Sequence, residues 1–187
     1  AAFSPAVSNQ AAAQSESYAS LLEEEYWQQK VDYVIRARLD TENKLLAGSE
    51  EITYQNNSPD TLEEFHIHLY PNAYREKTSR LIKDYMPGTT FFLIGLSESR
   101  RGWMDVTRLA VNGEEIGFEV EGTVLSAGFP STLEPDSVAV IEVEFKEKIR
   151  KTLGRAGYTG KHFDMAQWYP KMAVYDRRGW HPDQFRR

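Results

Sequence analysis

The stretch VAVIEVEFKEKI, residues 138–149, decides the fold class of this chain, because apolar and charged side chains alternate along it. Its two expected faces are an apolar one with Ile141, Val143, Phe145 and Ile149, and a charged one with Glu142, Glu144, Lys146 and Lys148. Successive side chains of a β-strand point to opposite sides of the sheet, so a period of two indicates a strand with one buried face. We therefore predict a half-buried strand over residues 138–149.

The same alternation recurs along the chain. The first predicted strand, 31–40, has Val31, Tyr33, Ile35, Ala37 and Leu39 on one face, and in the second Leu46, Ile52 and Tyr54 share a face. The third has Phe65, Ile67 and Leu69 on one face and His66, His68 and Tyr70 on the other. Further strands are predicted at 91–97, 103–111 and 115–125. Val111-Asn-Gly-Glu is a hairpin signal, because Asn-Gly favours the tight turns between antiparallel strands. Short strands joined by polar turns, without βα units, predict an all-β, mainly antiparallel protein.

The N-terminal part of the chain has a different character. Residues 1–17 are rich in Ala, Ser and Gln and have no periodicity, which predicts a disordered lead-in. A short helix is expected within residues 17–28, with Ser17 or Ser20 as its N-cap. Residues 18–187 are then expected to form a single β-rich domain, since this length is close to the usual size of one domain.

Composition and charge argue against several classes of protein. Cys is absent among the 187 residues, which removes disulfides, thiolate metal sites and a Cys nucleophile. The formal net charge is −6, and an acidic body with basic residues gathered from Lys146 onward argues against a nucleic-acid binder. No run approaches the ~18 apolar residues of a membrane span, so we expect no membrane segment. The start at Ala1 among small residues slightly favours export to the periplasm or outside the cell; a cut within a longer chain explains it equally well.

The four His residues do not follow a metal-binding pattern. None begins an H-E-x-x-H helix, the spacing that presents two imidazoles and a Glu base to zinc. His66 and His68 point the same way on a predicted strand, but no third ligand follows at a readable spacing. We therefore predict neither a metal site nor a catalytic residue in this chain.

Aromatic residues with polar groups are concentrated in AQWYPKMAVYDRRGWHPD, residues 166–183. Such side chains are typical of binding surfaces and domain interfaces. This segment resembles the end of the N-terminal domain in bacterial members of the aminopeptidase N/leukotriene-hydrolase family of gluzincin zinc metallopeptidases. YWQQKVDYVIRARLD (26–40) and EEITYQNNSPDTLEEFHIHLYPNAYR (50–75) resemble the same family, so the resemblance spans Tyr26 to about Trp180 with a weak middle at 75–135.

The resemblance implies a saddle-shaped β domain that packs on a separate thermolysin-like peptidase domain. That second domain holds the zinc through H-E-x-x-H and a distant Glu, and neither this motif nor G-x-M-E-N occurs here. The chain alone is therefore expected to hold no cofactor and to be inactive as a peptidase. In relatives, a Gln or Glu of the late segment binds the free α-amine of the substrate, and Gln167 is the candidate, although its spacing to the next basic residue is one residue shorter.

Two other interpretations remain open at this point. In the first, Gln167 satisfies a backbone group at an interface instead of binding substrate. In the second, the chain is a stand-alone β-sandwich module for protein interaction or carbohydrate binding, which uses Trp168, Tyr169 and Trp180. The same three aromatic residues are the expected interface with the peptidase domain. Without that domain, their side of the sheet is expected to be bare and to favour self-association.

Overall fold

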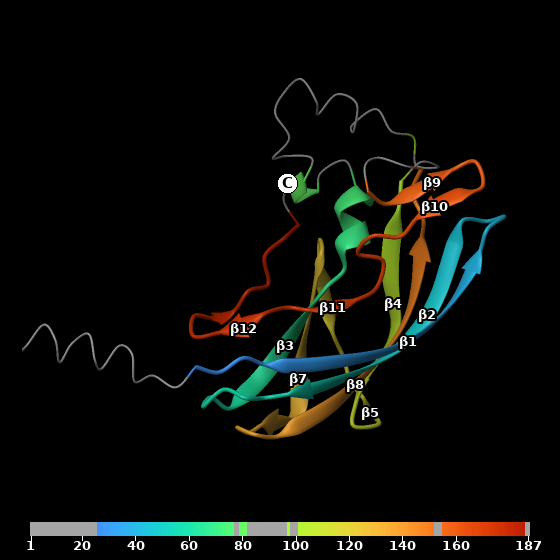
Figure 1. Cartoon of the computed structure of the whole chain (residues 1–187). Coiled ribbons are helices and arrows are strands. Elements are labelled where there is room, and N and C mark those ends of the chain that lie inside the picture. Colours follow the sequence, from blue (N-terminus) through green and yellow to red (C-terminus); the bar gives the residue numbers. More distant parts are fainter. Residues whose placement is uncertain (1–25, 77–78, 82–96, 98–100, 152–154, 186–187) are drawn as a thin grey trace, which may run out of the picture.

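The computed structural model describes residues 26–76, 79–81, 97, 101–151 and 155–185. Its larger sheet is antiparallel and has the order β1-β2-β8-β4-β5 (Figure 1). The strands of this sheet are β1 (Lys30–Asp40), β2 (Leu45–Gln55), β8 (Val138–Lys148), β4 (Trp103–Val111) and β5 (Glu114–Glu115). The decisive stretch 138–149 is thus β8, at the centre of this sheet.

A second antiparallel sheet has the order β11-β3-β7-β6. Its strands are β11 (Lys171–Met172), β3 (Leu62–His68), β7 (Val124–Leu133) and β6 (Glu119–Glu121). Two small hairpins, β9 (Gly157–Thr159) with β10 (His162–Asp164) and β12 (Tyr175–Asp176) with β13 (Gly179–Trp180), and the 3₁₀ turn η1 (Tyr70–Tyr74) complete the elements. The all-β, antiparallel fold class is confirmed. No helix among the described residues is long and apolar enough to cross a membrane.

Most of the predicted strands are confirmed, and one is wrong as a single element. The stretch 115–125 is divided between β5, β6 and the start of β7, because the chain turns at Gly122, whose φ is 57°. Most of the predicted helix 17–28 and of the segment 91–97 lies outside the described residues, as does the lead-in 1–17; residues 26–28 are not helical. The Asn112-Gly113 hairpin is confirmed, with φ values of 51° and 82°.

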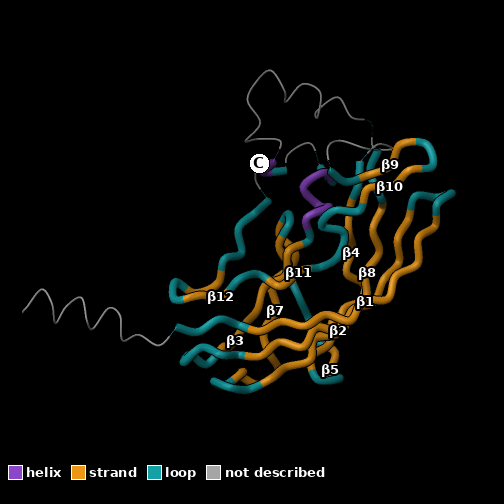
Figure 2. The backbone as a smooth tube through the Cα atoms, in the orientation of Figure 1, coloured by secondary structure: helices purple, strands orange, loops and turns teal. Residues whose placement is uncertain are grey.

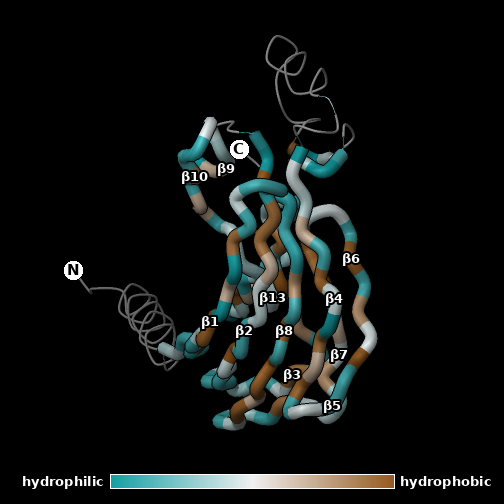
Figure 3. Tube along the Cα trace, turned by 90° about the vertical axis from the view of Figure 1, so that its right-hand side faces the viewer, coloured by the Kyte–Doolittle hydropathy of each residue, from teal (hydrophilic) through white to brown (hydrophobic). Residues whose placement is uncertain are grey.

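The core lies between the two sheets. Figure 3 shows brown, apolar positions recurring along β8, β4 and the strands behind them. The largest fully buried side chains come from both sheets: Tyr54, Ile52, Phe145, Ile141, Val143, Met104 and Leu109 from one, and Phe65, Ile67 and Leu125 from the other. Burial of these apolar side chains is the main stabilising contribution to the fold.

Gly48 lets the ring of Phe145 lie directly on the backbone of β2. The two residues are register partners on neighbouring strands. A Cβ added at Gly48 would lie 2.7 Å from Cε1 of Phe145, closer than two carbon atoms can approach. The glycine therefore provides the space that this core ring occupies.

We expect Gly48→Ala to destabilise the domain by ~1–3 kcal/mol, because the added methyl forces the buried Phe145 ring to shift. Gly117→Ala is the matched control, since a Cβ at Gly117 meets no atom within 4 Å. Urea unfolding of the two variants measures the difference. Equal midpoints would show that the ring relaxes without cost.

Two glutamates lie in the core face, which the alternation did not predict. Glu50 of β2 is 3% exposed and Glu147 of β8 is 7% exposed. Neither carboxylate oxygen of Glu50 has a hydrogen-bond partner among the described residues. Burial raises the pKa of Glu50 to about 8 and that of Glu147 also to about 8, although the nearby Arg150 opposes the second shift. Both carboxyl groups are therefore protonated over much of the neutral range.

This burial makes the stability of the fold pH-dependent. Between the ordinary pKa of 4.5 and the raised pKa of about 8, folded Glu50 keeps a proton that the unfolded chain releases. The free energy of unfolding therefore falls as pH rises through this window, by an amount on the order of a few kcal/mol. We expect Glu50→Gln to reduce the dependence to the part that Glu147 contributes, while Glu51→Gln at the neighbouring exposed position keeps it in full. Urea unfolding at pH 5 and pH 8 compares the three proteins, and identical slopes would contradict the assignment to Glu50.

Candidate functional site

The chain after β10 adds β11 to the edge of the second sheet, beside β3, and carries the residues singled out by the sequence. Figure 2 shows this part mostly as loop with short strands. Its β11 pairs with β3 through Lys171 and Met172, and Ala173 N–H then donates to His66 O at 2.8 Å. These backbone bonds hold the C-terminal segment, residues 165–185, against the second sheet.

The three predicted interface residues are half-buried and pack against this chain's own core. The Trp168 ring lies 6.5 Å from that of Phe145, and the Tyr169 ring lies 5.5 Å from that of Tyr33. The Trp180 ring lies 5.9 Å from that of Tyr54. Among the described residues, no ring contact joins Trp180 to the other two. Much of their apolar surface is thus already covered, and an interface role stays a prediction for the parts that remain exposed.

Gln167 sits in an unusual backbone conformation. Its φ is 55°, in the left-handed region, which a residue with a Cβ enters at a cost of order 1 kcal/mol. The side chain is exposed, and none of its atoms bonds to a described residue. The conformation therefore directs Gln167 outward, between the neighbouring Trp168, which packs inward, and the loop before it.

Gln167 lines an open hollow of about 510 Å³ together with residues of η1, β3 and the segment 181–185. The other lining residues are His68, Tyr70, His181, Asp183, Gln184 and Phe185. Gln167 and Asp183 are among the lining residues, and the oxygens of an amide and of a carboxylate accept hydrogen bonds. A hollow with such groups suits a ligand that donates hydrogen bonds and carries positive charge.

His68 forms the buried wall of this hollow as a neutral ring. Its imidazole stacks on Tyr70, with the ring centroids 5.0 Å apart and the planes at 12°. Burial lowers the pKa of His68 below its usual 6.5, and the charge of Lys171 lowers it further. The ring is therefore uncharged at pH 7 and adds no repulsion toward a cation.

The other strand histidine, His66, is also occupied by packing. Its Nδ1 lies 2.8 Å from Ser126 Oγ, and its ring meets the edge of Trp180 at 5.6 Å. Within the part of the chain that the structure describes, no group of three His, Asp or Glu side chains is placed to hold a metal ion. The described residues therefore do not fit a zinc centre.

Gln184 fastens the end of the segment to the turn between β6 and β7. Its side-chain oxygen accepts from Thr123 N–H at 2.8 Å and from the Thr123 hydroxyl at 3.0 Å, and its Nε2 donates to Glu121 O at 2.7 Å. Phe185 N–H donates to Thr123 Oγ1 at 2.8 Å. A Cβ at Gly122 would collide with the Gln184 amide group. This clamp positions Asp183 on the hollow, and no signal in the sequence pointed to it.

We expect Gln184→Ala to release residues 183–185, because it removes three hydrogen bonds and leaves Thr123 N–H without its partner. The amide of Phe185 should then exchange its hydrogen at least about tenfold faster, as expected for the loss of ~1.4 kcal/mol of protection. Gln167→Ala is the matched control, since that side chain makes no bond to a described residue. Unchanged exchange at Phe185 would contradict the clamp.

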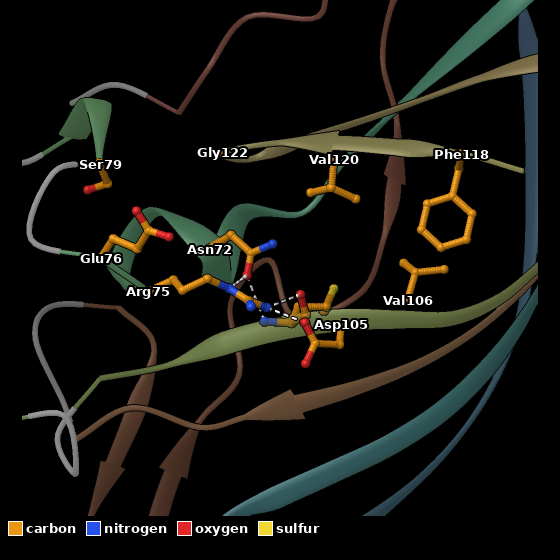
Figure 4. Close-up of a pocket in the computed structure, with 10 residues that line it drawn as sticks. Asn72, Arg75, Glu76, Ser79, Asp105, Val106, Phe118, Val120 and Gly122 are labelled. Carbon is orange, nitrogen blue, oxygen red and sulfur yellow. Dashed lines mark hydrogen bonds and ion pairs between the residues drawn. The ribbon is translucent and has the colours of Figure 1, made fainter.

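A second hollow, of about 380 Å³, lies between β4 and β6 (Figure 4). At one end Arg75 donates from Nε to Asn72 Oδ1 at 3.0 Å and forms an ion pair with Asp105. At the other end are the apolar side chains of Phe118 and Val120. The Arg75 charge is thus already neutralised by Asp105, and no other Lys or Arg is among the described residues that line this hollow.

Comparisons with known proteins give a likeness of fold. The chain matches no protein-family model, and no curated protein matches it. Among solved structures it is similar to a mutant of the M1 zinc metallopeptidase from Deinococcus radiodurans, at 13% identity over 83% of this chain and 28% of that chain, with a TM-score of 0.45. It is also similar to a second structure of an M1 zinc metallopeptidase from Deinococcus radiodurans, at 11% identity over 81% of this chain and 27% of that one, with a TM-score of 0.44.

A third similar structure is a two-domain M1 zinc metallopeptidase mutant bound to L-arginine, at 12% identity over 84% of this chain and 29% of that chain, with a TM-score of 0.45. The chain thus spans less than a third of the length of each of these structures. A likeness at this identity and TM-score carries no information about activity.

Proposed function

We propose that this chain is the non-catalytic N-terminal domain of a zinc-dependent aminopeptidase. In this proposal it packs on a catalytic domain and forms one wall of the substrate cleft. Zinc would be held by residues outside this chain, because the described residues offer no set of ligands for it. The proposal rests on the sequence resemblance of residues 26–40, 50–75 and 166–183, and on the geometry around Gln167.

The single observation that carries the proposal is the placement of Gln167. A left-handed φ of 55° at a residue other than glycine is strained, and strain of this kind is concentrated at functional sites. The side chain gains no hydrogen bond to a described residue in return. Gln167 therefore does not satisfy a backbone group among the described residues, and its exposed amide is accessible to a ligand.

The surroundings of Gln167 favour an ammonium group as that ligand. Gln167 and Asp183 both line the hollow, and burial lowers the pKa of His68, which lines it too. An α-ammonium offers three hydrogen-bond donors and one positive charge. The free N-terminus of a peptide therefore fits this site better than an internal peptide segment.

Exposed apolar surface on the same segment supports a domain contact. Val174, between β11 and β12, is 61% exposed. Trp168, Tyr169 and Trp180 each leave part of their ring uncovered. A catalytic domain seated on this side would bury Val174 and the exposed ring edges, as aromatic residues do at domain interfaces.

Kinetics of the longer protein test the proposal. We expect an H-E-x-x-H motif in the coding sequence that follows residue 187. Gln167→Ala should then lose ~1.5–3 kcal/mol of binding to a charged amine. This corresponds to a roughly ten- to hundredfold lower kcat/KM for substrates with a free α-amine. Asp183→Asn should weaken the same substrates.

The control is Lys161→Ala, which removes an exposed charge in the turn between β9 and β10 and should leave kcat/KM unchanged. Equal kcat/KM values for the wild type and Gln167→Ala would show that Gln167 does not bind the substrate amine. A stop codon without a downstream peptidase motif would favour the stand-alone interaction or carbohydrate-binding module. The isolated chain should hold no zinc, and one tightly bound zinc per chain by elemental analysis would refute the proposed division of roles.

A further inference from the structure

Strand β1 is a long edge strand of the larger sheet. Its 11 residues pair with β2 without a register shift, and within the described part of the chain no other strand pairs with it. Figure 3 shows β1 at the outer border of the sheet, beside β2. The strand KVDYVIRARLD contains no Pro and no bulge, two of the devices that prevent an edge from adding another strand. It does carry charged side chains, a third such device, so the order of these charges decides which strand can be added.

The order of charges along β1 is complementary to itself when the strand is read in the opposite direction. Two copies of β1 can pair antiparallel about a two-fold axis at Ile35. Each residue then faces the residue of the second copy for which the two residue numbers add up to 70. Asp32 then faces Arg38 of the second copy, and Lys30 faces Asp40. Because the two-fold axis repeats every pair, the interface contains four cross-strand pairs of opposite charge. No two like charges face each other directly in this register.

The apolar positions agree with the same register. On the solvent side, Val34 is 51% exposed and faces Arg36, whose methylene stem can cover it. On the other side, Val31 faces Leu39, which is 38% exposed. Ile35 faces Ile35 on the axis, and β-branched residues pack well in such cross-strand pairs. A one-residue slip would place Asp32 opposite Ala37 or Leu39, so the charges select a single register.

We propose that β1 is a self-association edge, at which a second copy of this chain adds antiparallel to form a continuous sheet across a two-fold axis. The interface is isologous, since the same strand serves both partners. It does not use the C-terminal segment, so it is independent of the role proposed for Gln167. It also differs from an association through the aromatic side of the chain.

Salt distinguishes these two surfaces. Pairs of opposite charge at a solvent-exposed edge are weakened when ions screen them. Association through β1 should therefore weaken as the salt concentration rises. Association through the side that carries Trp168, Tyr169 and Trp180 would strengthen with salt instead. The chain from Lys146 onward is basic, so salt screens the repulsion between two such surfaces.

Sedimentation velocity of the full chain at increasing concentration and at low and high salt is the test. We expect a concentration-dependent dimer that weakens with salt. Asp32→Arg alone and Arg38→Asp alone each place like charges opposite each other twice, and each should weaken the dimer at least about tenfold. The double variant, Asp32→Arg with Arg38→Asp, restores the pairs and should recover the affinity. Glu119→Arg, a reversal at an exposed position of β6, should have no effect.

A cross-link reports the register. The chain has no Cys, so a single introduced thiol can form only an intermolecular disulfide. Ile35→Cys should cross-link readily on mild oxidation, whereas Arg38→Cys on the same strand should not, because its two copies lie far apart along the pair. A monomer under all conditions would overturn the proposal. So would a dimer that tightens with salt, ignores both charge reversals or cross-links through residue 38.

Discussion

The ring of Phe145 lies on the bare backbone of Gly48, and the C-terminal segment is built upon that contact. Because the ring sits low over β2, its other side is available to Trp168, whose centroid is 6.5 Å away. Trp168 is the residue after Gln167, so its packing fixes where the chain turns and which way Gln167 points. The strained φ of Gln167 is tolerated because the chain that follows it is held by the packing of Trp168 and by the pairing of β11 with β3. A contact in the middle of the core thus determines the position of an exposed side chain at the hollow.

The elements that alternation predicts well are those whose two faces differ strongly in polarity. β8 and β1 carry charges on one face along most of their length, and both were predicted within one residue of their observed ends. β7 (Val124–Leu133) was missed, since VLSAGFPSTL contains Gly, Pro and several small polar residues and shows no clear period. It nevertheless forms a strand because β3 and β6 pair with it on both sides. Neighbouring strands impose the extended conformation there, and a single sequence does not reveal those neighbours.

The core face also contains two buried carboxyl groups, which the alternation of apolar and polar residues does not predict. Glu50 and Glu147 occupy positions that the period assigns to the interior, and the pattern accommodates them only as exceptions. At the site, the resemblance to the family named Gln167 but neither Asp183 nor Gln184. Gln184 holds this end of the segment through contacts with Gly122 and Thr123, about 60 residues earlier in the chain, and one sequence does not reveal such contacts. The predicted interface aromatics were selected by type. Residue type alone does not distinguish an aromatic ring that binds another domain from one that packs against its own core. Trp168, Tyr169 and Trp180 pack against their own core with much of their surface.

Tyr33 connects the two surfaces for which we propose roles. It lies in β1, and its hydroxyl accepts from Met172 N–H of β11 at 3.1 Å, while its ring meets Tyr169 at 5.5 Å. Burial raises the pKa of Tyr33 to about 12, so this hydroxyl stays protonated throughout the neutral range. The free edge of β1 is thus joined, through one side chain, to the segment that carries Gln167 two residues before Tyr169.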